Sequence, residues 1–287
     1  MRQLSRKTTG FTLVELIVVI AIIGILAAGA VQFIRNPLQM YIDIETRAAL
    51  TDLADSTLRK MSREIEKSLP NSVRVTTNGN DSMIEFVPIV NAGRYRASIG
   101  SPDTRLTDEA LDFSASSGTF DVLGPSITAC TSCTDQLVIF NLGVSDADVY
   151  EGSNRRTITT ITTDTTYDES KVSFSGGTFP FPSPASRFYI VSTPVSYACD
   201  MTTDTSNNKL YRYENYGFQT SQPASVASLD SITPSTNKTL VAENLSSCQI
   251  TYNATNQRNG IVSIYIALSE SNANVRLMHQ VRVINSP

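Results

Sequence analysis

Glu15 is the residue whose position most needs a chemical explanation. It lies within a run from Phe11 to Val31 that only Thr12 and Glu15 interrupt with polar side chains. A carboxylate costs about 2.5–3.5 kcal/mol at the centre of a bilayer and less near its surface, so such a group is expected to have a charged partner. No basic residue follows it within one or two helical turns. The partner must therefore come from the basic segment before the run, or from an amine that cleavage of the chain creates.

Four cysteines, Cys130, Cys133, Cys199 and Cys248, form the second set of reactive groups. Four thiolates with one C-x-x-C pair can hold zinc, but the second pair lacks the short spacing of a zinc ribbon. In an oxidising compartment an even number of cysteines favours disulfides.

Of the three possible disulfide connectivities we prefer Cys130–Cys133 with Cys199–Cys248. A two-residue spacing closes most easily on itself, and Cys248 follows a candidate strand that could lie beside the strand near Cys199. A redox-active C-x-x-C is the alternative, although its loop-like neighbourhood shows no helix start that would activate a thiol.

Other catalytic arrangements are absent from the sequence. His279 is the only histidine, and its place in an alternating segment favours a packed or surface imidazole over a general base. No glycine-rich phosphate loop occurs. The acidic pairs Asp146 with Asp148 and Asp164 with Asp168 lack the regular ligand spacing of a calcium motif. We therefore predict no enzymatic activity, no cofactor and no bound metal.

The apolar run is long enough to cross a membrane. Residues Phe11 to Val31 give about 32 Å of helix, against a hydrocarbon core of about 30 Å. Three basic residues precede the run and the next charge after it is Arg35, so the positive-inside rule predicts a cytoplasmic N-terminus. A secretory signal peptide, cut near the small residues 27–30, is the competing interpretation. Such a peptide has a shorter apolar stretch and does not explain Glu15.

The segment Gly10-Phe11-Thr12-Leu13-Val14-Glu15 resembles the processing site of type IV prepilins and of the pseudopilins of type II secretion. The resemblance implies that a prepilin peptidase cuts between Gly10 and Phe11 and, as an N-methyltransferase, methylates the new amino group of Phe11. It further implies that Glu15 pairs with the Phe11 amino group of a neighbouring subunit during assembly. Such an ion pair would offset part of the desolvation of the carboxylate.

The same resemblance implies where the chain is located and what it binds. The protein is expected in the inner membrane as a single-pass chain, with its N-terminus cytoplasmic and its head periplasmic, and later in a pilus at the cell surface. Its implied partners are membrane lipid before assembly, other pilin subunits through the N-terminal helix, and an inner-membrane assembly platform.

The chain is predicted to divide into four segments. These are a cleaved leader (1–10), a transmembrane and filament-core helix (11–34), an amphipathic helix that continues into the head (35–70), and a β-rich periplasmic or extracellular head (71–287). Pro37 predicts a kink or local melting of the helix near Phe33 to Pro37. Apolar residues then recur at helical spacing, and we expect this stripe to lie against the head: Leu50, Ala54, Leu58, Met61, Ile65 and Leu69.

The head sequence predicts a mostly antiparallel sheet. Nine short segments have the composition and turn signals typical of strands: Val73–Thr77, Met83–Pro88, Gln136–Phe140, Thr157–Ile161, Arg187–Ser192, Leu210–Tyr213, Thr239–Glu243, Ile261–Leu268 and Val275–Val283. The last two alternate and predict a C-terminal hairpin. Residues 91–118, 145–185 and 200–235 are predicted to be long surface loops. The fold class is therefore α+β, a pilin-like lollipop with a long N-terminal helix packed on a mostly antiparallel sheet.

The net charge of the chain argues against one class of partner. It is −4, and loss of the three basic residues in the leader would make it −7. Because phosphate binding needs a basic face, we do not expect nucleic acid to be a partner.

Two segments of the head narrow the family resemblance. Residues 275–287 and 243–248 resemble minor pilins of the mannose-sensitive haemagglutinin pilus, the class often called MshO. This implies a minor pilin incorporated into a pilus or priming its assembly, and supporting surface attachment. Two alternatives stay open: a J-type minor pseudopilin of a type II secretion system, and a tip adhesin whose head binds a surface ligand. In the adhesin hypothesis Tyr211, Tyr213 and Tyr216 could line the binding site.

Overall fold

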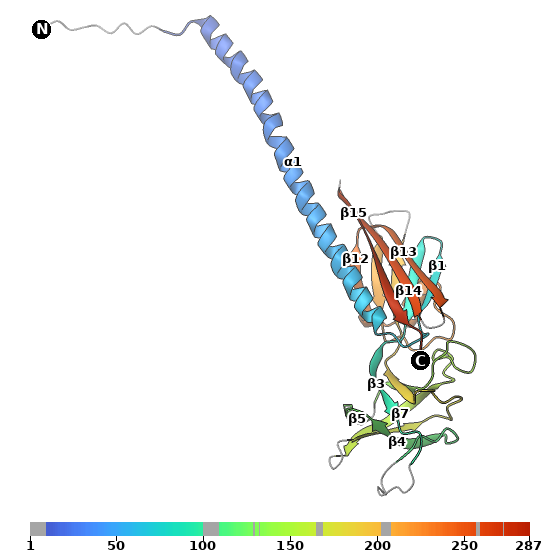
Figure 1. The fold of residues 1–287 in the computed structure, drawn as a ribbon. Helices are drawn as coiled ribbons and strands as arrows, with labels where there is room; N and C mark the ends of the chain where they lie inside the picture. Colours follow the sequence, from blue (N-terminus) through green and yellow to red (C-terminus); the bar gives the residue numbers. More distant parts are fainter. Residues whose placement is uncertain are drawn as a thin grey trace, which may run out of the picture.

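The computed structural model describes residues 10–99, 109–128, 130–131, 133–164, 169–201, 208–256, 259–271 and 273–287. One long helix, α1 (Leu13–Glu66), leads into two β-sheet lobes (Figure 1). We call the lobe beside the helix the proximal lobe and the lobe farther from the N-terminus the distal lobe. An N-terminal apolar helix with a largely antiparallel body agrees with the predicted α+β class. The predicted leader, apart from Gly10, lies outside the described residues.

Helix α1 is continuous through Pro37, so the predicted local melting at this position is wrong. A proline inside a helix removes one hydrogen bond and costs about 3 kcal/mol, and the long helical segments on both sides of it retain their own bonds. The helix ends at Glu66, before the predicted end at residue 70. It ends there because Leu69 N–H donates to the carbonyl of Val87 at 2.8 Å, which draws the chain into a β-type pairing.

Two antiparallel sheets form the proximal lobe. The first has the strand order β1 (Arg74–Asn78), β2 (Asp81–Phe86), β10 (Val195–Asp200), β11 (Lys209–Tyr213), β12 (Lys238–Glu243). The second consists of β13 (Leu245–Asn256), β14 (Asn259–Glu270) and β15 (Ala273–Ile284), and its last two strands form the predicted C-terminal hairpin. A short helix, α2 (Val226–Ile232), packs beside β10 and is followed by a 3-10 turn, η2 (Ser235–Asn237).

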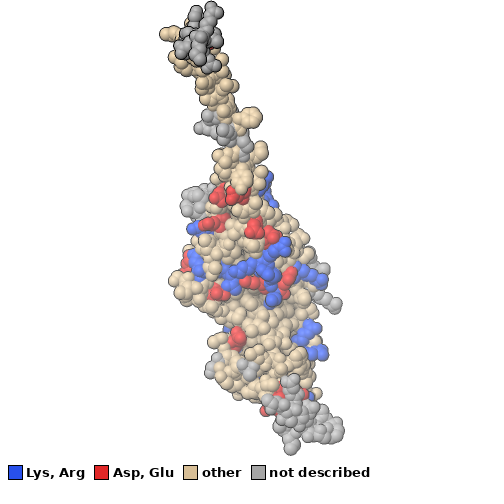
Figure 2. Space-filling view, turned by 90° about the vertical axis from the view of Figure 1, so that its left-hand side faces the viewer, with Lys and Arg blue, Asp and Glu red and all other residues tan. Residues whose placement is uncertain are grey.

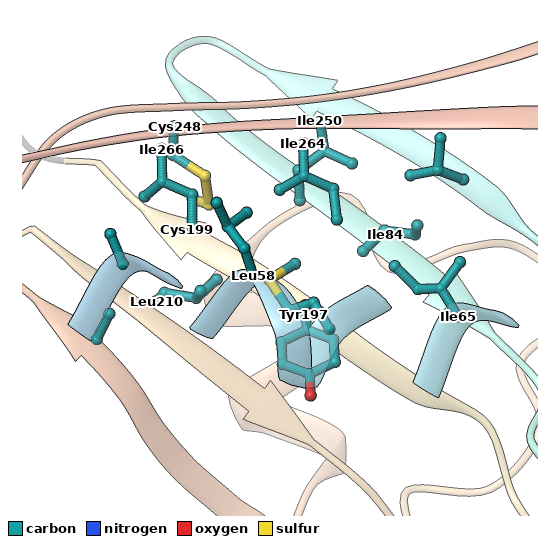
Figure 3. Close-up of a cluster of buried hydrophobic side chains, with 14 of the residues drawn as sticks. Leu58, Ile65, Ile84, Tyr197, Cys199, Leu210, Cys248, Ile250, Ile264 and Ile266 are labelled. Atoms are coloured by element: carbon teal, nitrogen blue, oxygen red, sulfur yellow. A yellow bond between two sulfur atoms is a disulfide. The ribbon is translucent and has the colours of Figure 1, made fainter. Parts of the chain in front are cut away.

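The core of the proximal lobe is built from α1 and both sheets. The predicted apolar stripe of the helix is buried: Leu50, Ala54, Leu58, Met61 and Ile65 are at most 3% exposed. They share one cluster with Ile84, Tyr197 and Leu210 of the first sheet and with Ile250, Ile264 and Ile266 of the second (Figure 3). Burying each such side chain is worth about 1.5–3 kcal/mol. The lower half of α1 is therefore part of the head.

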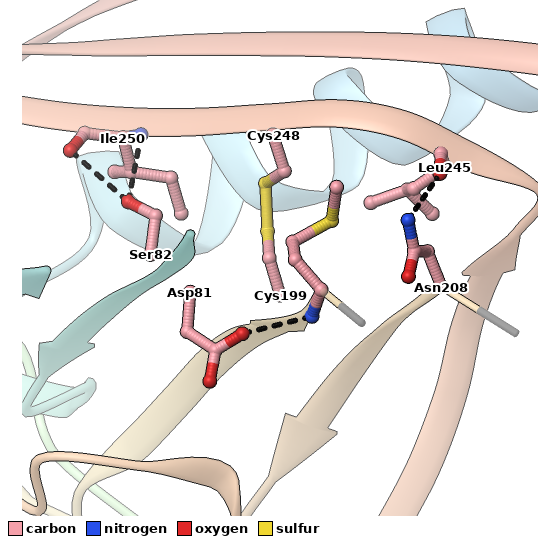
Figure 4. The surroundings of a disulfide bond; sticks show 8 residues. Asp81, Ser82, Cys199, Asn208, Leu245, Cys248 and Ile250 are labelled. Carbon is pink, nitrogen blue, oxygen red and sulfur yellow. Dashed lines mark hydrogen bonds between the residues drawn. A yellow bond between two sulfur atoms is a disulfide. The ribbon is translucent and has the colours of Figure 1, made fainter. Parts of the chain in front are cut away.

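A disulfide and a hydroxyl group join the two proximal sheets. Cys199 of β10 is bonded to Cys248 of β13 (Figure 4). Close by, the Ser82 hydroxyl accepts a hydrogen bond from Ile250 N–H at 2.9 Å and donates to the Ile250 carbonyl at 3.3 Å. The disulfide and these hydrogen bonds thus join the two sheets, which are not connected by continuous strand pairing.

The distal lobe is a small closed arrangement of strands. Its order is β5 (Cys130–Thr131), β7 (Arg155–Asp164), β6 (Gln136–Val138), β9 (Arg187–Val191), β3 (Ile89–Tyr95), β4 (Ser117–Leu123), β8 (Glu169–Ser175). Because β8 also pairs with β7, six of these strands form a closed ring around an aromatic core that includes Phe120, Phe174 and Phe188. The Cys130–Cys133 disulfide lies at β5.

The prediction of three long surface loops is wrong over much of their length. Residues 91–118 include most of β3, residues 145–185 include β7 and β8, and residues 200–235 include β11 and α2. Strands β7 and β8 are rich in Ser and Thr, a composition that is also typical of loops, and the sequence predicts only Thr157–Ile161 of these two as a strand. Their buried positions nevertheless alternate, as in β8, where Ser170, Val172 and Phe174 point inward.

A buried charged group connects the two lobes. Glu85 of β2 is fully buried and forms an ion pair with Arg74 of β1. Its other carboxylate oxygen accepts a hydrogen bond from the Tyr216 hydroxyl at 2.8 Å. The Arg74 guanidinium lies 3.6 Å from the ring centre of Tyr150, whose hydroxyl donates to the Ser72 carbonyl at 2.8 Å. Burial raises the pKa of Glu85 even though Arg74 opposes this shift.

Replacing Glu85 by Ala should lower the free energy of unfolding by about 3 kcal/mol. The reason is that breaking a buried ion pair leaves the other charge without compensation. Chemical denaturation of the full-length protein in detergent measures the effect. The matched control is Asp55→Ala, which removes the partner of Arg59 in an exposed pair on α1 and should cost little. Equal losses for the two variants would contradict the structural role of Glu85.

The two disulfides should contribute unequally to stability. Cys199–Cys248 joins residues 49 apart and Cys130–Cys133 joins residues 3 apart. By the loop-entropy estimate, the double Cys→Ala variants should lose about 4 and about 2 kcal/mol, respectively. The same denaturation experiment compares them. A greater loss from removing the short-range disulfide would argue against the 199–248 link as the main tie of the proximal lobe.

Candidate functional site

The upper half of α1 is apolar on every side and nothing in the described chain covers it. Its large apolar side chains from Leu13 to Leu26 are between 43% and 75% exposed. Leu13–Ala30 has a mean hydropathy of 2.7, and among the described residues it is the one helix long and apolar enough to cross a membrane. A helix that is apolar all round is stable only inside lipid or among other helices. This surface is therefore a contact surface for something outside the chain.

The first turn of the helix is closed by a reciprocal pair of side chains. Thr12 is the N-cap residue, with φ −82° and ψ 148°, and its hydroxyl accepts a hydrogen bond from Glu15 N–H at 3.3 Å. The Glu15 carboxylate reaches back to Thr12 N–H at 3.5 Å and to the Thr12 hydroxyl at 3.4 Å. A capping box of this kind satisfies amide groups that would otherwise lack partners at a helix start.

Thr12 is a residue of this site that the sequence analysis did not single out. The signal was present, because Thr-x-x-Glu directly before an apolar run is the pattern of a capping box. The contacts of the Glu15 carboxylate are long for hydrogen bonds, so the cap satisfies this charge only weakly. A stronger donor placed near the first turn could therefore compete for it.

Gly10 and Phe11 precede the helix as an exposed peptide. Phe11 is 80% exposed, and no atom lies within 4 Å of the place where a Cβ would stand on Gly10. Among the described residues, which exclude 1–9, none beyond their chain neighbours covers the bond between them. An amino group created at Phe11 would lie next to Thr12, at the same end of the helix as the Glu15 carboxylate. The structure thus brings Gly10, Phe11 and Glu15 together at one helix terminus.

The other chemical groups do not assemble into a second site. All four cysteines are in disulfides, Cys130–Cys133 and Cys199–Cys248. In the part of the chain that the structure describes, no cluster of three or more His, Cys, Asp or Glu residues could hold a metal ion. His279 lies exposed on β15.

Of the four aspartates considered as calcium ligands, three lie in the described part of the chain. Asp148 accepts a hydrogen bond from Tyr150 N–H at 2.7 Å, and Asp146 occupies a turn with φ 68°. Asp164 ends strand β7, and Asp168 lies outside the described residues.

The three tyrosines proposed to line a ligand site belong to one cluster, in which the rings of Tyr211 and Tyr213 lie edge to face with their centres 6.2 Å apart. Tyr213 is buried and donates a hydrogen bond to Asp230 at 2.9 Å, while Tyr216 is buried against Glu85. Tyr211 lies beneath the Lys238 ammonium, 4.1 Å from its ring centre. Because Tyr213 and Tyr216 are buried, the three rings do not form an exposed binding surface.

Comparison with known proteins gives one match, at the N-terminus. The prokaryotic N-terminal methylation motif matches residues 5–31, which include Gly10, Phe11, Thr12 and Glu15. No curated protein and no solved structure matches the chain. This motif indicates a protein of the type IV pilin and pseudopilin family, processed by a prepilin peptidase and assembled with other pilins, and suggests a structural subunit rather than an enzyme.

Proposed function

We propose that this chain is a minor type IV pilin that is cut after Gly10 and then enters a pilus or primes its assembly. The observation that carries the proposal is the uncovered apolar half of α1, with a carboxylate at its first turn. Lipid can cover this helix before assembly, and the helices of other subunits can cover it afterwards. A soluble role would leave the same surface in water at a large free-energy cost.

The proposed mechanism begins with processing at the inner membrane. The leader, residues 1–10, stays on the cytoplasmic side and is removed by the prepilin peptidase, which methylates the amino group of Phe11. Residues 11–34 hold the chain in the bilayer. Residues 35–70 lead into the periplasmic head, residues 71–287.

The charge of Glu15 gives assembly its register in this proposal. Within the described residues of the isolated chain, the carboxylate has the long contacts of the Thr12 cap. In the filament an adjacent Phe11 amino group would replace these contacts with an ion pair. A subunit placed out of register would leave both charges unpaired in an apolar surrounding, which is strongly unfavourable. An assembly platform in the inner membrane would supply the subunits.

Two other functions remain compatible with the same anchor. A J-type minor pseudopilin of a type II secretion system would use the N-terminal helix in the same way. A tip adhesin would present the distal lobe, which lies farthest from the anchor (Figure 1). The likeness of residues 275–287 and 243–248 to the MshO class of the mannose-sensitive haemagglutinin pilus favours the minor pilin.

A strain lacking the gene tests this choice. We expect fewer surface pili and normal secretion of enzymes, with recovery on expression of the full chain. Loss of secretion with normal pili would assign the chain to a pseudopilus. If pili and secretion both persist and only attachment is lost, the distal lobe would act as an adhesin. All three readouts come from the same cultures.

Replacing Glu15 by Ala should leave membrane insertion intact and lower filament incorporation at least about tenfold, since an unpaired amino group would be buried. Immunoblots of membrane and sheared-filament fractions measure this ratio. Glu15→Gln keeps the shape of the side chain and should behave like the Ala variant. Glu66→Ala, which removes an exposed carboxylate at the far end of α1, is the matched control. Normal incorporation of the Gln variant would show that the charge is dispensable.

A further inference from the structure

Two arginines lie opposite each other on the distal lobe without a carboxylate between them. Arg94 of β3 and Arg187 of β9 occupy directly opposite positions of an antiparallel pair, and both are exposed. Directly opposite residues have Cβ atoms about 4.5–5.5 Å apart on one face of the sheet, and like charges at this distance destabilise the pairing. Among the described residues, neither guanidinium forms an ion pair. An anion held between the two side chains would remove this repulsion.

Two other cations of the distal lobe are neutralised by carboxylates. Arg96 lies 3.1 Å from Asp121, and Lys171 lies 3.2 Å from Glu109. On the side of the molecule that Figure 2 presents, charged groups of both signs crowd the proximal lobe and are sparse on the lobe below it. The unmatched arginine pair is thus a local feature of the distal lobe.

The Arg94 side chain is held in place by the turn that precedes β9. Its Nε donates a hydrogen bond to the Ala185 carbonyl at 3.1 Å, and its other N–H groups have no acceptor among the described residues. The turn is tied to β3, because Tyr95 N–H donates to the Ser186 carbonyl at 2.8 Å and the Tyr95 hydroxyl accepts from Ser183 N–H at 3.1 Å. The guanidinium is therefore oriented before a ligand arrives, which lowers the cost of binding.

A groove of about 370 Å³ opens beside this oriented guanidinium, which is enough room for a small ligand. Its walls combine the apolar side chains of Leu123 and Pro184 with the hydroxyl groups of Ser98 and Ser186. A sugar ring offers matching C–H faces and hydroxyl groups, and a guanidinium fork matches a carboxylate. The one aromatic residue among the described lining residues, Tyr95, is only 1% exposed, so it cannot stack on a nucleic-acid base. The groove thus suits an acidic sugar better than a nucleic acid.

The arginine pair lies at the end of the two strands that is remote from the proximal lobe. The distal lobe is inserted between β2 and β10, which pair with each other at Phe86 and Val195. From this junction β3 and β9 run side by side, with Ile89 opposite Val191 at the near end and the arginines at the far end. Because the distal lobe is also the part of the head farthest from the anchor (Figure 1), a polymer outside the membrane can reach the groove.

We propose that Arg94 and Arg187 bind the carboxylate of an acidic sugar unit in a polysaccharide, with the sugar ring in the adjoining groove. Two guanidinium groups on one carboxylate form charge-assisted hydrogen bonds and no longer repel each other without compensation. The site uses none of the three tyrosines considered above. It does not depend on the kind of filament that carries the chain, so it goes beyond the proposed function.

Titration of the full-length protein in detergent with a galacturonate trimer, followed by calorimetry at physiological salt, tests the proposal. Arg94→Gln with Arg187→Gln should lower the affinity at least about tenfold, because both charge-assisted contacts are lost. The matched control, Arg276→Gln with Arg282→Gln, removes the same charge from exposed positions of β15 and should bind as the wild type does. A neutral galactose trimer should bind at least about tenfold more weakly than the galacturonate trimer.

Thermal denaturation without ligand separates binding from folding. Removing one charge of a repelling pair should not destabilise the lobe, so Arg187→Gln should unfold at or above the wild-type midpoint. A clearly lower midpoint would contradict the inferred repulsion.

Three results of the titration would overturn the proposal: no galacturonate binding by the wild type, equal losses in the two double variants, or equal binding of the neutral trimer. Tighter binding of an oligonucleotide or of polyphosphate than of galacturonate would also overturn it, since the arginines would then serve a phosphate ligand. These measurements need no assembled filament, so their failure leaves the proposed function intact. A chain that is neither cut after Gly10 nor incorporated would disprove the proposed function and leave the sugar site standing.

Discussion

An apolar helix with no cover from its own chain is the constraint on which the rest of this structure depends. About half of α1 buries nothing in the described protein, and its large apolar side chains from Leu13 to Leu26 remain exposed. Water cannot be its stable surrounding. The helix therefore needs an apolar cover from outside the chain, which in the proposed function is first lipid and then the helices of neighbouring subunits. The Glu15 carboxylate at the first turn limits how neighbouring helices can be arranged, because an arrangement that leaves this charge unpaired in an apolar surrounding is unfavourable.

The same helix also serves as the core element of the proximal lobe. Its lower half contributes Leu50 to Ile65 to a cluster shared with both sheets, so the helix is packed into the head at their junction. The Cys199–Cys248 disulfide joins the two sheets within this same core, whereas the buried Glu85 pair lies on the opposite face of β2 from the core residue Ile84.

The sequence predicted those parts of the molecule in which local pattern and tertiary environment agree. The apolar span, the apolar stripe of α1 and the C-terminal hairpin belong to these parts. The stripe and the hairpin each bury one face, and the span buries none, so the periodicity of their apolar residues predicts them directly. The Thr and Ser content of β8, and of β7 outside the predicted segment Thr157–Ile161, concealed strand residues whose inward positions alternate within a closed ring. Strand β13 is not among the predicted strands, although the disulfide that its Cys248 forms with Cys199 is the predicted one.

Two further features required the three-dimensional structure. Pro37 is tolerated because helix on both sides outweighs one lost hydrogen bond. The buried position of Glu85 could have been suspected from its apolar neighbours Ile84 and Phe86, but its partners Arg74 and Tyr216 come from β1 and from the loop after β11. Contacts of this range leave no periodic signal in the sequence.

The most direct test of the central claim is the intact mass of the protein isolated from sheared surface filaments. The account predicts a chain that starts at Phe11, ends at Pro287 and carries one additional methyl group on its amino terminus. The apolar helix would then have left the membrane with the head attached. A filament fraction without this chain, or a chain that begins at Met1 or after Ala30, would contradict the account.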